Sequence, residues 1–133
     1  MGNNQTGLVF TGALCAFFAV AMGAFGAHAL APILSERSLA IWQTGVHYQM
    51  FHATALLFLA WYASSRSRAS DKLLTWAGRA FFSGILLFSG SLYALALSEI
   101  KILGIITPFG GISFLAGWAL VMYDAFIQLK HGK

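Results

Sequence analysis

Four long stretches without a charged side chain most limit what this chain can fold into. They cover residues 7–31, 40–63, 80–98 and 102–123, and none contains Asp, Glu, Lys or Arg. A helix of about 20 apolar residues crosses the hydrocarbon core of a bilayer, and only helices and closed barrels satisfy every backbone group in lipid. Because a barrel strand needs only about 10 residues, these lengths indicate helices. The sequence therefore predicts an all-α integral membrane protein, a four-helix transmembrane bundle with short loops.

The composition excludes the main soluble classes. Hydrophobic residues make up 59% of the chain and charged residues 9%, whereas an average soluble domain has about 25% charged residues. Disordered and nucleic-acid-binding proteins need charge, so we expect no nucleic-acid partner. The single cysteine, Cys15, cannot close an intramolecular disulfide, which excludes a secreted disulfide scaffold. The expected surroundings are the lipid bilayer, and no linker indicates a second domain.

Proline sets the start of the last span. Pro108 lies near the beginning of the fourth stretch, and proline is tolerated in the first turn of a helix but not in its interior. We therefore expect the regular helix to begin near Thr107, with residues 102–106 at the membrane interface. The predicted spans of this single domain are residues 7–31, 40–63, 80–98 and 107–126.

The basic residues predict the orientation. An even number of spans places both termini and the middle loop on one side of the membrane. That side carries six of the eight basic residues, namely Arg66, Arg68, Lys72, Arg79, Lys130 and Lys133, while Arg37 and Lys101 lie on the other side. Because lysine and arginine collect on the cytoplasmic side, we predict an inner-membrane protein with both termini in the cytoplasm. Residues 68–79 read either as a loop or as a short basic helix on anionic headgroups.

Small residues predict how the spans pack, because helices in lipid associate by close backbone approach. The first span carries one stripe of Gly12, Ala16, Ala19, Gly23, Gly26 and Leu30. Similar stripes are Ser83, Leu87, Gly90, Ala94 and Leu97 in the third span, and Gly110, Ser113, Gly117 and Val121 in the fourth. This spacing predicts a tight left-handed bundle with antiparallel neighbours. The glycines expected at helix contacts are Gly12, Gly23, Gly26, Gly90, Gly110 and Gly117.

Three histidines inside the predicted spans are the candidate site, because ionisable groups in a membrane are costly. His28 and His47 lie at similar predicted depth and would be able to meet, while His52 lies about 7.5 Å deeper than His47 and on another face. Tyr48, Gln49 and His52 form a polar strip that should face the bundle.

The polar strip has three interpretations. His28, Tyr48, Gln49 and His52 would line a proton or solute path, or the histidines would hold a metal or haem. Structurally, the same side chains would make interhelical hydrogen bonds of about 0.6 kcal/mol each. No carboxylate or thiol lies at the same depth, so no metal or other cofactor is expected.

Arg79 and Asp124 fall at the cytoplasmic ends of the third and fourth spans. They would form an interhelical ion pair or remain two separately solvated charges. The sequence contains no serine-histidine-carboxylate set, paired carboxylates or phosphate-binding loop, so we predict that the protein is not an enzyme.

Several short motifs carry a resemblance to a known family: GAFGAHAL at residues 23–30, the stretch 42–52 with Tyr48 and His52, FSGS at 88–91, and TPFGG at 107–111 followed by Gly117 and Trp118. Together they resemble the YgdD/YwdK-like family of small bacterial membrane proteins, domain of unknown function 423, which has a short eukaryotic transmembrane relative. The resemblance spans nearly the whole chain and implies a four-span inner-membrane protein. It implies no established activity, but it makes His28, Tyr48 and His52 stronger candidates.

The functional hypothesis is a non-enzymatic accessory or scaffolding component that self-associates or joins a larger membrane complex. It follows from the dense small residues, the short loops and the lack of a soluble domain. The alternatives are a small proton or solute channel or carrier, and haem or metal binding by the histidines.

Overall fold

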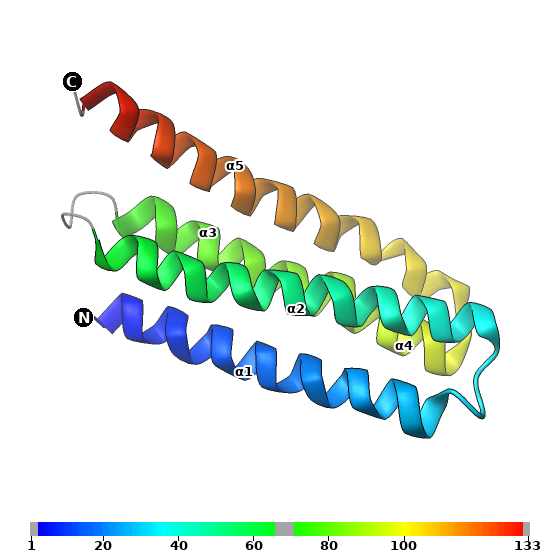
Figure 1. Cartoon of the computed structure of the whole chain (residues 1–133). Helices are drawn as coiled ribbons and strands as arrows, with labels where there is room; N and C mark the ends of the chain where they lie inside the picture. The colour runs from blue at the N-terminus through cyan, green and yellow to red at the C-terminus, as the bar shows by residue number, and fades with distance from the viewer. Residues whose placement is uncertain (1–2, 66–70, 132–133) are drawn as a thin grey trace.

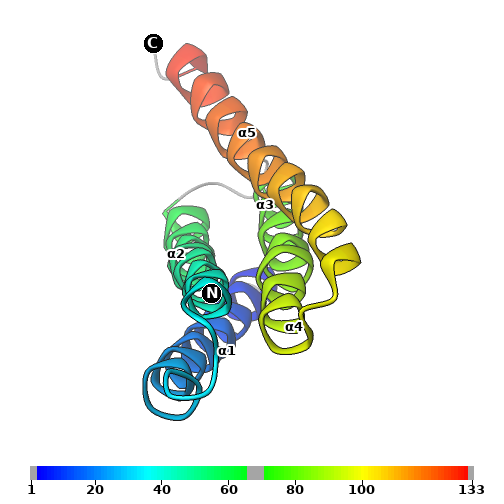
Figure 2. The same ribbon diagram turned by 90° about the vertical axis from the view of Figure 1, so that its right-hand side faces the viewer.

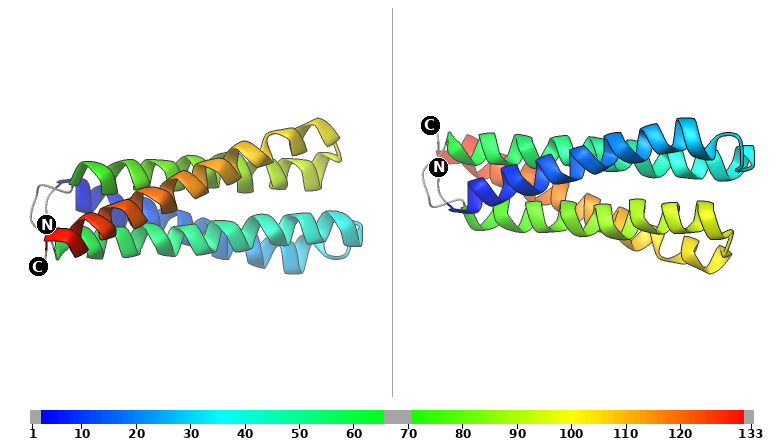
Figure 3. Two further views of the ribbon diagram at one scale, coloured as in Figure 1. Left: turned by 90° about the horizontal axis from the view of Figure 1, so that it is seen from above. Right: turned by 90° about the horizontal axis from the view of Figure 1, so that it is seen from below.

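The computed structural model describes residues 3–65 and 71–131, which form four antiparallel helical rods (Figure 1). The first rod is α1 (Asn3–Phe25) with the π-helical η1 (Gly26–Leu30), and the second is α2 (Glu36–Ser64). The third rod is α3 (Asp71–Gly84), continued by the π-helical η3 (Ile85–Ser89) and by α4 (Gly90–Ser98). The fourth rod is the 3-10 helix η4 (Lys101–Ile105) followed by α5 (Thr107–His131). The start of α1, the end of α2, the start of α3 and the end of α5 share one end of the bundle (Figure 3). The predicted all-α four-helix architecture is confirmed.

The rods differ in how well they suit lipid. Three helical stretches in the described part of the chain are long and apolar enough to cross a membrane, Asn4–Leu30, Lys72–Ser98 and Lys101–Lys130. The second rod, α2, is not among them, although it has 29 residues. Its neighbours compensate for its polarity, because α1, α3, η3 and α4 all pack against it. The rod that does not reach the apolar threshold is therefore packed against both the first and the third rod.

The small-residue stripe of α1 lies against α2. A Cβ on Gly12 would touch Leu57 at 3.0 Å, and Ala19 is fully buried. A Cβ on Gly26 would come within 2.6 Å of the indole nitrogen of Trp42, so only glycine allows this approach. At Gly23 the fit is looser, since the added atom would make an ordinary contact. The expectation that a helix lies along this stripe agrees with the packing.

The expected stripe of the third rod faces the wrong way. The buried face of this rod is formed by Phe81, Ile85, Ser89, Leu92 and Ala96. The predicted positions, from Ser83 to Leu97, are displaced by about two residues, which is about 200° around a helix. A Cβ on Gly90 would meet nothing within 4 Å, so this glycine does not mediate a helix contact within the bundle. The face that packs in the bundle is the one that carries Phe81, Ile85 and Leu92, not the one that carries the stripe of small residues.

The third rod also begins earlier than predicted. α3 starts at Asp71 instead of residue 80 and runs without a break into η3. Leu74 and Ala77 are buried in the core, so residues 71–79 are neither a loop nor a helix lying on headgroups. Residues 66–70 lie outside the described residues. The predicted start of the last helix at Thr107 is confirmed, and the 3-10 helix η4 precedes it.

The core has two parts. The larger cluster joins α1, α2, α3 and α5 through residues that include Leu56, Leu59, Phe81 and Phe114, and the smaller one joins η1, α2 and α4 through Leu30, Trp42, Val46 and Ala96. Seen from above, α5 crosses the bundle obliquely: its first half lies over the third rod and away from α2, and its second half comes toward α2 (Figures 2 and 3). This oblique crossing leaves room between α2 and the first half of α5.

Candidate functional site

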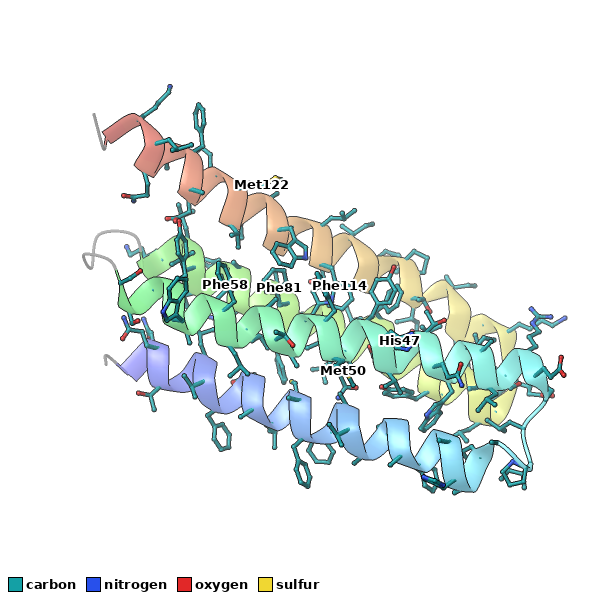
Figure 4. All side chains as sticks on the ribbon, in the orientation of Figure 1. His47, Met50, Phe58, Phe81, Phe114 and Met122 are labelled. Atoms are coloured by element: carbon teal, nitrogen blue, oxygen red, sulfur yellow. The ribbon has the colours of Figure 1, made fainter. Side chains whose placement is uncertain are left out.

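A cavity of about 790 Å³ lies between α2 and α5 and opens to the side of the bundle. We call it the α2–α5 groove. It is lined by His47, Tyr48, Phe51, His52, Phe88, Pro108, Gly111, Ile112, Phe114, Leu115 and Trp118. Figure 4 shows His47 on α2 and Phe114 between the ribbons of α2 and α5. The lining is predominantly aromatic and aliphatic, with a few polar atoms, which is the usual character of a small-molecule site.

Glycines on α5 create the groove by fixing this helix to the third rod. Gly110 lies against the backbone of Phe88, and a Cβ on Gly117 would come within 2.5 Å of the Phe81 ring. Ser113 adds a hydrogen bond from its hydroxyl to the carbonyl oxygen of Ala80, at 2.8 Å. Because α5 lies close to the third rod, it is farther from α2. Its aromatic side chains Phe114 and Trp118 span the remaining distance and contact His52 of α2.

His52 forms the floor of the groove and is only 3% exposed. Its Nδ1 lies 2.8 Å from the carbonyl oxygen of Tyr48, and its Nε2 lies 3.2 Å from the indole nitrogen of Trp118. A carbonyl oxygen can only accept and an indole N–H can only donate, so we assign the proton to Nδ1 and a neutral ring to His52. The ring also stacks on Phe114, with centroids 3.5 Å apart and planes inclined by 6°. Nδ1 is therefore bonded within α2, and Nε2 joins α2 to α5.

Gln49 points away from the groove. Its amide nitrogen donates to the carbonyl oxygen of Cys15 at 3.0 Å, and its amide oxygen accepts from the hydroxyl of Tyr93 at 2.8 Å. The side chain is 6% exposed and joins α1, α2 and α4. Gln49 thus acts as an interhelical bridge to α1 and α4, whereas His52 bonds to α5.

His47 and Tyr48 lie at the open side of the groove. Tyr48 is 44% exposed and packs its ring on Phe88, with centroids 4.3 Å apart. Within residues 3–65 and 71–131, neither the Tyr48 hydroxyl nor the His47 ring has a hydrogen-bond partner. His28 is exposed on η1 and does not line the groove. The structure therefore brings His47, Tyr48 and His52 together and separates them from His28 and Gln49.

The interhelical ion pair of Arg79 and Asp124 stays a prediction. Arg79 is exposed, and its guanidinium lies 4.9 Å from the ring centroid of Trp76, three residues earlier on the same helix face. The buried face of α3 carries Ala77 and Phe81. Asp124 is 1% exposed on α5.

The arrangement favours binding by stacking and neutral hydrogen bonds. Among the described residues, no group of three His, Cys, Asp or Glu side chains is placed to hold a metal ion. The sequence indicated Trp118 as a motif residue, but its hydrogen bond to His52 and the stacking of Phe114 on His52 were not predicted. Phe114 and Trp118 are four residues apart and therefore lie on one face of the fourth span, and this spacing is the sequence signal that could have indicated them.

Comparisons with known proteins agree with the architecture. The profile of a family described as protein of unknown function (DUF423) matches residues 22–111. A UPF0382 membrane protein of Staphylococcus haemolyticus is 42% identical over 118 residues, covering 89% of this chain and 93% of the relative. The UPF0382 membrane protein YwdK of Bacillus subtilis is 44% identical, covering 88% and 94%. The UPF0382 inner membrane protein YgdD of Escherichia coli is 44% identical, covering 92% and 90%. No solved structure matches the chain.

Proposed function

The chain belongs to the DUF423 family, and we propose that it is a non-enzymatic accessory component that self-associates or joins a larger membrane complex. The observation that supports this role is the use of the buried polar groups. Gln49, His52 and Ser89 each bond to a neighbouring helix, so these groups hold the bundle together instead of facing a substrate. A rigid bundle whose outer faces are apolar is suited to lateral contacts in the bilayer.

Two alternatives receive less support from the same contacts. A proton or solute path would need a continuous polar strip, but Gln49 and His52 face different neighbours and are bonded to them. Haem or metal binding would need several ligands at one place, whereas both nitrogens of His52 are engaged and His47 is the other histidine that lines the groove. His28 is exposed on η1 and lies outside the groove.

Native mass spectrometry of gently extracted membranes tests the accessory role. Tagged and untagged copies of the full chain are expressed together, and we expect either mixed multiples of the 14.3 kDa chain or a constant protein partner. As a control, the two forms are expressed separately and mixed after extraction, which should give no mixed species. A chain that is always single and without a partner would contradict the proposal.

The proposed orientation has its own test. With both termini in the cytoplasm of a bacterial cell, the described end of α5 lies inside and η4 lies at the outer end. A membrane-impermeant maleimide should label Lys101→Cys in spheroplasts and label Lys130→Cys only after permeabilisation. Cys15 is buried and contributes little background. The reverse labelling pattern would invert the topology.

A further inference from the structure

We propose that the α2–α5 groove binds a membrane-soluble compound with a flat ring that carries carbonyl or hydroxyl oxygens, the chemical class of the quinones. Tyr48 and His47 would hydrogen-bond to those oxygens. This inference goes beyond the accessory role and does not depend on it.

The first support is the depth of the unpartnered groups. α2 has 29 residues, about 43 Å of helix, so a hydrocarbon core of about 30 Å centred on this rod would leave about 6 Å of helix beyond it at each end. Tyr48 lies 12 residues after Glu36, which is about 18 Å along the axis and about 12 Å inside the hydrocarbon edge. Lipid chains cannot bond to a phenol hydroxyl or an imidazole N–H at this depth, and leaving such groups unbonded is costly. An occupant with its own oxygens would satisfy them.

The second support is the aromatic character of the wall. His52 and Phe114 stack on each other with centroids 3.5 Å apart and are buried, whereas the rings of Tyr48 and Phe51 are 44% and 60% exposed and line the groove. An exposed aromatic ring offers a face or an edge on which another ring can pack. The volume of about 790 Å³ is within the usual range for a small-molecule site, about 300 to 1,000 Å³.

The depth also argues against a phospholipid as the preferred occupant. Its ester oxygens stay at the interface, near Glu36 and Glu99, while its chains are purely apolar. A quinone carries its oxygens on the ring and dissolves in the hydrocarbon region. The proposed ligand therefore combines a flat body for the aromatic wall with acceptors for Tyr48 and His47.

Calorimetric titration of the full chain in phospholipid nanodiscs tests this site, with empty nanodiscs correcting for partition into lipid. The probe is 2,3-dimethyl-1,4-naphthoquinone, and 2,3-dimethylnaphthalene is the matched compound without oxygens. We expect the quinone to bind the unaltered chain about fivefold more tightly than the hydrocarbon does, the difference one or two hydrogen bonds provide. Tyr48→Phe should weaken quinone binding by about the same factor and leave hydrocarbon binding unchanged.

Tyr123→Phe is the control, because this tyrosine is exposed on α5 and lies outside the groove. It should bind the quinone like the unaltered chain, and thermal melting followed by circular dichroism confirms that both variants are folded. Equal affinity for the two compounds, or no heat beyond partition, would overturn the proposal. In native membranes, p-benzoylphenylalanine in place of Leu115 provides a further check, since crosslinking to another protein would assign the groove to a partner helix. Failure of quinone binding leaves the mass-spectrometric test of the accessory role unaffected.

Discussion

α1 and α5 both rest on a neighbouring rod through small residues, but they are held in different ways. Hydrogen bonds fasten α1 to α2 along its whole length, from Gln5 to the Ala63 carbonyl, from Gln49 to the Cys15 carbonyl and from Trp42 to the Met22 carbonyl. α5 is bonded on its other side, to the third rod, through Ser113 to Ala80 and Thr107 to Ser91. One hydrogen bond joins it to α2, from Trp118 to His52.

The difference shows how a groove can persist in a small bundle. Where two helices share small residues and hydrogen bonds along their whole length, as α1 and α2 do, no groove remains between them. A helix that is fixed obliquely along one edge leaves its other side to be bridged by aromatic rings. Substitutions at the contacts that distinguish the two interfaces measure how far each interface depends on them.

The largest effect is expected where α5 meets the third rod. Gly110→Leu places a large side chain against the Phe88 backbone and should lower the free energy of unfolding by about 3 kcal/mol. Gly90→Leu is the matched control, because nothing lies within 4 Å of its Cβ position, and its effect should stay within about 0.5 kcal/mol. Unfolding in mixed detergent micelles measures both. Equal losses would mean that the tight contact does not hold α5.

An intermediate effect is expected at the bridge between α1, α2 and α4. Gln49→Leu removes two interhelical hydrogen bonds and leaves the Tyr93 hydroxyl without its acceptor, which should cost about 2 kcal/mol in unfolding free energy. Gln43→Leu changes an exposed glutamine of the same helix and should be close to neutral. If the two variants unfold alike, the hydrogen bonds of Gln49 contribute little to the closed side.

The smallest effect is expected at the bridge across the groove. Trp118→Phe keeps an aromatic ring but removes the donor to His52, and such bonds in membrane proteins average about 0.6 kcal/mol. The same unfolding measurement on Trp61→Phe, which alters an exposed tryptophan, should show no change. A loss for Trp118→Phe larger than the loss for Gly110→Leu would mean that this bond, more than Gly110, fixes α5.

Much of the fold could be predicted from local rules. The charge-free stretches predicted the helices, and Pro108 predicted the start of α5 at Thr107. The small residues of α1 predicted the face of this helix that meets α2. The predicted packing face of the third rod was wrong because both faces of this rod carry residues that suit a helix contact. Periodicity alone cannot say which face is buried; the fit of Phe81 and Ile85 into the core decides it.

The candidate site was less predictable because it depends on the path of α5. Gln49 and His52 are three residues apart and were expected to share one strip, yet each meets a different helix. The groove exists because Gly110 approaches Phe88, a contact between residues 22 positions apart. Such long-range contacts leave no local signature in the sequence.

The polarity of α2 has a consequence for how the protein is made. α2 is the rod that does not reach the hydropathy of a spanning helix, and each polar side chain near the middle of a segment raises its cost of insertion. We therefore expect α2 to leave the translocon together with α1, as a hairpin whose partner already covers Gln49. A reporter that carries α2 alone should insert poorly, and one that carries the hairpin should insert well.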